Sequence, residues 1–292
     1  MDKVAESNMA ATVAKLRSAL PLAQRIAPRR GLMELDFPEL WRYRELVYFL
    51  VWRDMKVRYK QTVIGAAWAV LQPFLTMVVF SLFFGKLAKM PSNGLPYPIF
   101  YYSALLPWTY FATSLQNAAN TMVDHQNVIT KVYFPRLLLP FSSVVSGLVD
   151  FSISFVFLLC MMAYYHIWPG PAILILPVFL LLEILTALAA GLWLSGLNAL
   201  YRDVRYVMPF LVQFWLFASP VAYPSSVVPA RWQWLYGLNP MAGVIEGFRW
   251  SLTGHGEPPG KLVLVSATVV LVALAGGVAY FQAIEGTIAD FV

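Results

Sequence analysis

Long uncharged runs alternate with short polar segments along most of this sequence, beginning after residue 61. A transmembrane helix needs about 20 mainly apolar residues to cross about 30 Å of hydrocarbon. Six runs reach or approach this length, and each contains at most one acidic residue. The pattern therefore predicts six spans, over 62–84, 99–121, 137–162, 172–197, 206–223 and 262–284.

The segment 224–260 decides how the predicted spans are oriented. Its prolines and charged residues prevent it from crossing hydrocarbon as a lipid-facing helix. Two short apolar stretches inside it, 229–238 and 241–253, predict a re-entrant helical hairpin that dips into the outer leaflet against protein. With both termini in the cytoplasm, 16 Lys and Arg residues lie inside and 5 outside. This is the asymmetry that the positive-inside rule requires.

The first 60 residues differ from the rest of the chain because they are polar and basic. Residues 1–37 lack the short basic region, apolar stretch and cleavage site of a secretory signal, and we expect a cytoplasmic N-terminal extension. The stretch 38–60 predicts a helix, since Pro38 suits a first helical turn. Its aromatic and basic residues favour an interfacial helix at headgroup depth. Residues 61–292 form the predicted six-span transmembrane domain.

Composition supports an all-α integral membrane protein. Of 292 residues, 59% are apolar and 12% are charged, whereas soluble domains carry about 25% charged residues. The single cysteine excludes an intrachain disulfide. We expect no metal site, cofactor or nucleic-acid partner. The sequence also lacks a G-x-x-x-x-G-K-[ST] phosphate loop and any catalytic motif, which disfavours an enzyme.

Asp150 and Glu183 are the acidic residues within predicted spans. Charge at that depth is costly and often marks a transport pathway or a proton relay. The favoured interpretation is a structural contact between helices, because the two acids lie in different spans without a chain of partners. A proton-coupled secondary transporter remains the alternative.

Aromatic residues gather in the second and fifth predicted spans. An aromatic belt or ordinary helix packing accounts for such groups. The functional alternative is a channel in which sugars slide over apolar ring faces. The candidate channel residues are Tyr97, Tyr101, Trp108, Phe111, Phe210, Phe214 and Phe217.

A basic cluster precedes the first span and consists of Arg53, Lys56, Arg58 and Lys60. Each basic residue near an anionic surface contributes about 1 kcal/mol of attraction. The cluster could therefore gather the anionic headgroup of a lipid anchor. The simpler interpretation is a topology signal beside ordinary anionic lipids.

Several short motifs, in their order and spacing, give the chain a family resemblance over about 40–290. They are WRDMKVRYK at 52–60, Gly65 and Trp68, LQP at 71–73, KVYFPR at 131–136, YRDVR at 201–205, SPV at 219–221 and LNPM at 238–241. In this arrangement the chain resembles the type-2 ABC exporter permeases for O-antigen, capsule and teichoic acid. A permease for drugs or small lipids is the alternative within the ABC class.

The resemblance implies a homodimer in the bacterial inner membrane, bound to two copies of a separate ATPase that holds ATP and Mg. The substrate would be a long glycan on a lipid diphosphate or a related lipid anchor. The cytoplasmic loop 124–136 would be a coupling segment seated in the ATPase. Its candidate contact residues are Asp124, His125, Asn127, Lys131, Tyr133, Phe134 and Arg136.

Overall fold

The computed structural model describes residues 41–60, 65–129, 131, 134–201, 203–256, 258 and 260–291. The chain divides into two compact units, 1–34 and 35–292, and every described residue lies in the second. The predicted extension 1–37 and residues 38–40 of the predicted interfacial helix lie outside the described residues. The described part of the chain contains helices and no strand, as the composition predicts.

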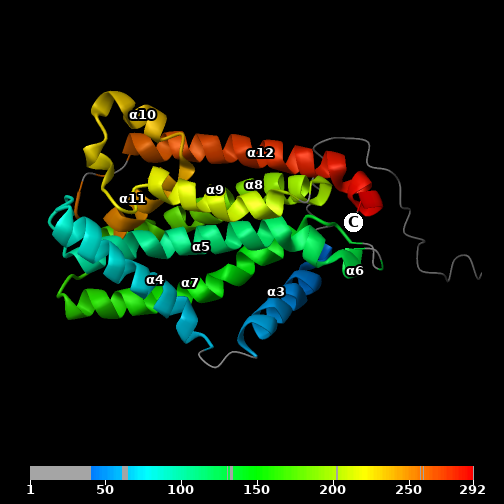
Figure 1. Ribbon diagram of the computed structural model, residues 1–292, viewed down its shortest axis with the longest axis horizontal. Helices are drawn as coiled ribbons and strands as arrows, with labels where there is room; N and C mark the ends of the chain where they lie inside the picture. Colours follow the sequence, from blue (N-terminus) through cyan, green and yellow to red (C-terminus); the bar gives the residue numbers. More distant parts are fainter. Residues whose placement is uncertain are drawn as a thin grey trace, which may run out of the picture. The chain divides into compact units, whose positions relative to one another are not determined.

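The long helices of the second unit lie side by side, with α5 packed between α7 and α8 and α12 packed on α8 and α11 (Figure 1). The α-helices are α3 (Arg44–Tyr59), α4 (Ala67–Phe80), α5 (Tyr97–Asp124), α6 (Gln126–Ile129), α7 (Leu138–Tyr164), α8 (Leu176–Leu200), α9 (Val204–Ala218), α10 (Gln233–Tyr236), α11 (Pro240–Thr253) and α12 (Gly260–Phe291). The shorter helical turns are η1 (Ser81–Leu87), which continues α4, η2 (Pro171–Ile175), which precedes α8, and η3 (Ser225–Val227) and η4 (Ala230–Trp232), which precede α10.

Four helices of the described chain are long and apolar enough to cross a membrane. They cover Ala67–Leu87, Leu138–Tyr164, Pro171–Leu200 and Gly260–Glu285. These helices confirm the first, third, fourth and sixth predicted spans as apolar helices of spanning length, with ends shifted by a few residues. The fifth predicted span is represented by α9, whose 15 residues extend about 22 Å.

The second predicted span corresponds to α5, whose 28 residues are long enough to cross a membrane but which is not among the helices apolar enough to do so by composition. Packing explains the difference, because α5 contacts α4, α7, α8, α9 and α11. Its surface therefore faces protein over much of its length, and buried Ser103, Ser114 and Thr121 replace lipid-facing side chains. A helix shielded in this way does not need the hydropathy that lipid exposure demands.

The predicted hairpin region contains helical segments at 230–236 and at α11. The Asn239 side chain accepts a hydrogen bond from the backbone N–H of Met241, and Pro240 takes the first helical position, so α11 begins there. At its other end, Gly254 has φ +65°, a left-handed conformation that glycine adopts without strain. Helix α11 is buried against α5, α8 and α12.

Candidate functional site

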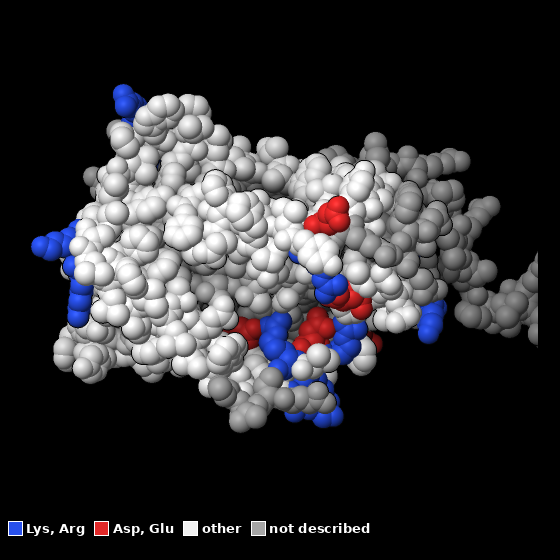
Figure 2. Space-filling model, in the orientation of Figure 1, with Lys and Arg blue, Asp and Glu red and all other residues white. Residues whose placement is uncertain are grey.

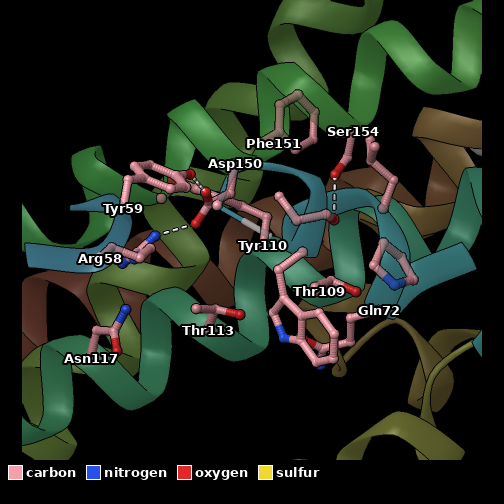
Figure 3. Close-up of a pocket in the computed structure, with 16 residues that line it drawn as sticks. Arg58, Tyr59, Gln72, Thr109, Tyr110, Thr113, Asn117, Asp150, Phe151 and Ser154 are labelled. Carbon is pink, nitrogen blue, oxygen red and sulfur yellow. Dashed lines mark hydrogen bonds and ion pairs between the residues drawn. The ribbon is translucent and has the colours of Figure 1, made fainter. Parts of the chain in front are cut away.

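A cavity of about 570 Å³ lies where the end of α3 and the start of α4 meet α5 and α7 (Figure 3). Its wall combines charged, hydroxyl, amide and apolar side chains. The lining residues are Arg58, Tyr59, Gly65, Trp68, Ala69, Gln72, Pro73, Leu106, Thr109, Tyr110, Thr113, Asn117, Gly147, Asp150, Phe151 and Ser154. This mixture suits a ligand with both polar and apolar parts.

An ion pair forms one side of this cavity. The guanidinium of Arg58, in the last turn of α3, donates to one carboxylate oxygen of Asp150, and the hydroxyl of Tyr59 donates to the other (Figure 3). Asp150 lies about halfway along α7. The nearby cation offsets the cost of placing a carboxylate within an apolar helix. With 92 positions between the partners, the sequence contains no local signal for this pair.

A polar stripe on α5 faces the same cavity. Thr109, Thr113 and Asn117 follow one another at intervals of four residues, which places them on one face of the helix. Gln72 and Trp68 of α4 line the cavity as well, and Trp68 is 55% exposed. Pro73, Leu106 and Phe151 supply apolar surface. The stripe can donate and accept hydrogen bonds, whereas the indole ring can stack.

The four residues of the predicted basic cluster lie in the last two turns of α3 and at its C-terminal cap, and several of them have partners within this chain. Arg53 pairs with Asp54 at 2.8 Å and also contacts His125, while Arg58 pairs with Asp150. The ammonium group of Lys56 lies 5.4 Å from the centre of the Trp52 ring. Lys60 is exposed. Two of the four cations therefore bind other parts of this chain.

The predicted coupling segment, 124–136, contacts several helices through its described residues. His125 Nδ1 lies 2.8 Å from the Thr121 carbonyl oxygen, and its Nε2 contacts Arg53 of α3. Asp124 lies 3.7 Å from Arg205 at the start of α9. The backbone N–H of Arg136 donates to the Glu285 carboxylate at 3.0 Å. These contacts link the segment to α3, α9 and α12.

The predicted coupling residues divide into an exposed and a buried group. Asp124, Asn127 and Lys131 are exposed, whereas His125 and Arg136 are half-buried. Phe134 is only 4% exposed and belongs to an apolar cluster with Leu50, Met122, Ile129, Leu139, Leu192, Ala199 and Phe281. Tyr133 lies outside the described residues. Within this chain, Phe134 is therefore part of the support beneath the segment.

The predicted channel aromatics also divide into two groups. On α5, Tyr101, Trp108 and Phe111 are buried in the core, and Tyr97 is half-buried. Phe111 packs edge to face on Trp215 of α9 at 5.0 Å. On α9, the rings of Phe210, Phe214 and Phe217 are exposed. Only the α9 group lies on the surface of the described chain.

Glu183 differs from Asp150, although both acids lie in predicted spans. Its side chain is fully buried in α8, and neither carboxylate oxygen has a hydrogen-bond partner among the described residues. Glu183 forms no ion pair with another described residue, and the hydroxyl of Tyr110 on α5 is an electrostatic neighbour.

A more deeply buried ion pair lies on α11, where Arg249 donates to Glu246 at 3.2 Å. Arg249 also donates to the Pro220 carbonyl oxygen at 2.8 Å and lies 3.9 Å from the centre of the Phe100 ring. The Glu246 carboxylate accepts from the Ser225 N–H. Burial raises the pKa of the neighbouring Tyr236 hydroxyl. The i, i+3 spacing of Arg249 and Glu246 is the one feature of the sequence that indicates this pair. No sequence feature indicates their contacts with α5 and with the segment 220–225.

Charged side chains on the face shown in Figure 2 lie in separate places. A mixed group of acidic and basic residues lies over α3, and basic residues lie at the opposite end, beyond η1 and α10. The broad area between them shows no Lys, Arg, Asp or Glu. Exposed apolar side chains such as Leu75 and Val79 belong to α4, and exposed Leu82 belongs to η1. An uncharged band of this kind suits contact with lipid hydrocarbon.

Comparisons with known proteins agree with these features. A family model described as ABC-2 type transporter matches residues 45–253. The chain is 33% identical over 247 residues to the O-antigen export system permease protein RfbA of Myxococcus xanthus, covering 84% of this chain and 94% of that protein. It is 24% identical to the protein of the same name from Klebsiella pneumoniae, covering 70% of this chain and 79% of that protein. It is 21% identical to the polysialic acid transport protein KpsM of Escherichia coli, covering 80% of this chain and 91% of that protein. This membrane protein therefore belongs to the ABC-2 type transporter family.

Proposed function

We propose that this chain is the permease of a bacterial inner-membrane exporter for lipid-linked polysaccharide of the O-antigen or capsule type. The supporting observation is its similarity to an O-antigen export permease over 84% of this chain and 94% of that relative. The cavity beside Arg58 and Asp150 adds a site whose charged and polar side chains could bind a polar headgroup. This proposal gives polysaccharide precedence over drugs or small lipids as the substrate.

The transporter would be a homodimer that carries two copies of a separate ATPase, which would supply the ATP and Mg site. The coupling segment 124–136 would meet the ATPase through exposed Asp124, Asn127 and Lys131. Its contacts with α3, α9 and α12 give movements of the ATPase a direct route into the membrane helices. In the same assembly, Phe210, Phe214 and Phe217 of α9 would face the glycan channel.

The proposed topology has six spans with both termini in the cytoplasm. Helix α5 would be a protein-shielded span, and α9 with residues 219–223 would be the fifth. The segments 230–236 and α11 would form the outer re-entrant hairpin, and α3 would lie at the cytoplasmic interface, where Trp41, Tyr48 and Trp52 are exposed.

Cysteine labelling tests the topology, because Cys160 is the chain's one cysteine and is exposed. In a Cys160→Ser background, a membrane-impermeant thiol reagent should label Lys89→Cys from outside the inner membrane. It should label Asn127→Cys only after the membrane is opened. Labelling of both positions from the same side would contradict this topology.

Reconstitution tests the proposed function. The permease and its ATPase would be placed in vesicles with a lipid-linked glycan, and a lectin confined to one side would report the transferred glycan. We expect lectin binding to rise with ATP and to stay at background with an ATPase variant that cannot hydrolyse ATP. Transfer driven by a proton gradient without ATP would contradict the proposal and favour a secondary transporter.

A further inference from the structure

We propose that the Arg58–Asp150 pair is an exchangeable anion site, in which the Asp150 carboxylate occupies the position that a phosphate of the lipid-linked glycan takes when the substrate binds. This inference rests on the proposed function and assigns the cavity between α3, α4, α5 and α7 to the phosphate and its first sugars. Asp150 would then act as a placeholder, and Arg58 would be the residue that binds the phosphate.

The chemistry of the pair permits this exchange. A guanidinium group binds carboxylate and phosphate oxygens with the same planar arrangement of donors. Arg58 points into the cavity, where Asp150 meets it (Figure 3). When a phosphate takes the guanidinium, Asp150 keeps the hydroxyl of Tyr59 as a donor. The displaced carboxylate is therefore not left without a hydrogen bond, which lowers the cost of the exchange.

The rest of the cavity wall is suited to a sugar joined to that phosphate. The stripe of Thr109, Thr113 and Asn117 presents hydroxyl and amide groups along α5, and these groups can pair with sugar hydroxyls. Trp68 offers an exposed indole face, on which the apolar face of a sugar ring can stack. A cavity of about 570 Å³ holds a headgroup, so the remaining glycan would extend outside it.

A purely structural pair makes a different prediction, because it would only join α3 to α7. In that case, removing either charge weakens the fold, and removing both together restores every property of the protein. In an exchangeable site, the two single substitutions have opposite effects on ligand binding. Asp150→Asn removes the competitor of the phosphate, whereas Arg58→Gln removes its receptor.

The test uses the full-length permease in phosphatidylethanolamine nanodiscs, with a polyprenyl-diphosphate-linked disaccharide as the probe and native mass spectrometry as the readout. We expect Arg58→Gln to weaken probe binding about tenfold, which is the scale of one charge-assisted hydrogen bond. Asp150→Asn should bind the probe more tightly than the wild type. Thr113→Val should weaken binding of the disaccharide probe but not binding of polyprenyl diphosphate alone. Lys86→Gln, in η1 at the other end of the first span, is the matched control.

Several outcomes would overturn the inference. Equal weakening by Arg58→Gln and Asp150→Asn, with recovery in the double variant, would show a structural pair. Displacement of the probe by equimolar phosphatidylglycerol would show an ordinary anionic-lipid site. The double variant also separates loss of binding from misfolding. It restores the charge balance between α3 and α7, and we expect it to fold but still to lack probe binding. Glycan transfer by the wild-type complex is scored separately, so these failures leave the proposed function standing, whereas absence of that transfer removes both.

Discussion

Arg53 of α3 and His125 at the end of α5 form a hydrogen bond although 72 positions separate them in the chain. His125 Nδ1 lies 2.8 Å from the Thr121 carbonyl oxygen, so this ring nitrogen carries the proton and Nε2 accepts from Arg53. The contact joins the helix before the first span to the proposed coupling segment. A displacement of one therefore acts directly on the other.

Replacing His125 with alanine should separate ATP hydrolysis from export. We expect the reconstituted transporter to keep its ATPase activity while glycan transfer per ATP falls several-fold, because α3 no longer follows the coupling segment. His255→Ala, in the exposed loop after α11, is the matched histidine control. An unchanged ratio of transfer to hydrolysis in His125→Ala would contradict this role.

The coupling segment should respond differently at its exposed and buried positions. Asn127→Ala with Lys131→Glu removes an exposed amide and reverses an exposed charge, so we expect reduced co-purification of the ATPase with little change in the melting temperature of the permease. Phe134→Ala opens a cavity in the core, and changes of this kind cost about 3–5 kcal/mol. Its main effect should be a lower melting temperature. A stable Phe134→Ala permease that fails to bind the ATPase would instead place this ring at the interface.

Glu183→Gln should preserve ATP-driven export. The amide has nearly the shape of the carboxyl group, and no hydrogen bond of Glu183 within the described chain is lost. Transport assayed with and without a protonophore should match the wild type. Loss of export in Glu183→Gln, together with a dependence of wild-type export on the proton gradient, would revive the secondary-transporter alternative.

Asn239→Ala should destabilise the part of the protein where the end of α9 meets the start of α11. The amide nitrogen donates to the Ala218 carbonyl oxygen and the Ser219 hydroxyl, and its oxygen accepts from Trp215 and the Met241 N–H. Four lost hydrogen bonds correspond to about 2–6 kcal/mol, which thermal unfolding in detergent would measure.

Asn239→Asp provides a graded comparison with this substitution. It keeps the accepting oxygen and loses the donors, so its melting temperature should lie between those of the wild type and Asn239→Ala. Equal melting temperatures for all three proteins would refute the role of Asn239 in joining α9 to α11.

Hydropathy along the chain determined which segments are apolar helices of spanning length, because the need to match about 30 Å of hydrocarbon acts on each segment separately. The predicted span 137–162 is thus found as α7, and 262–284 falls within α12. The sequence also determined the family resemblance, through short motifs in order. Two of these motifs have a visible local role, since Asn239 joins the end of α9 near Ser219 to the start of α11.

Only the tertiary structure decided which residues and helices that are far apart in the sequence become neighbours. Arg58 was predicted from its neighbours in a basic cluster, yet its partner is Asp150 on α7. Phe134 was predicted at a partner surface, yet its ring lies within this chain's own core. Helix α5 departs from the hydropathy of a span because other helices surround it. In each case the outcome depends on contacts between residues far apart in sequence, whereas hydropathy and motif spacing are local properties that do not specify which helices become neighbours.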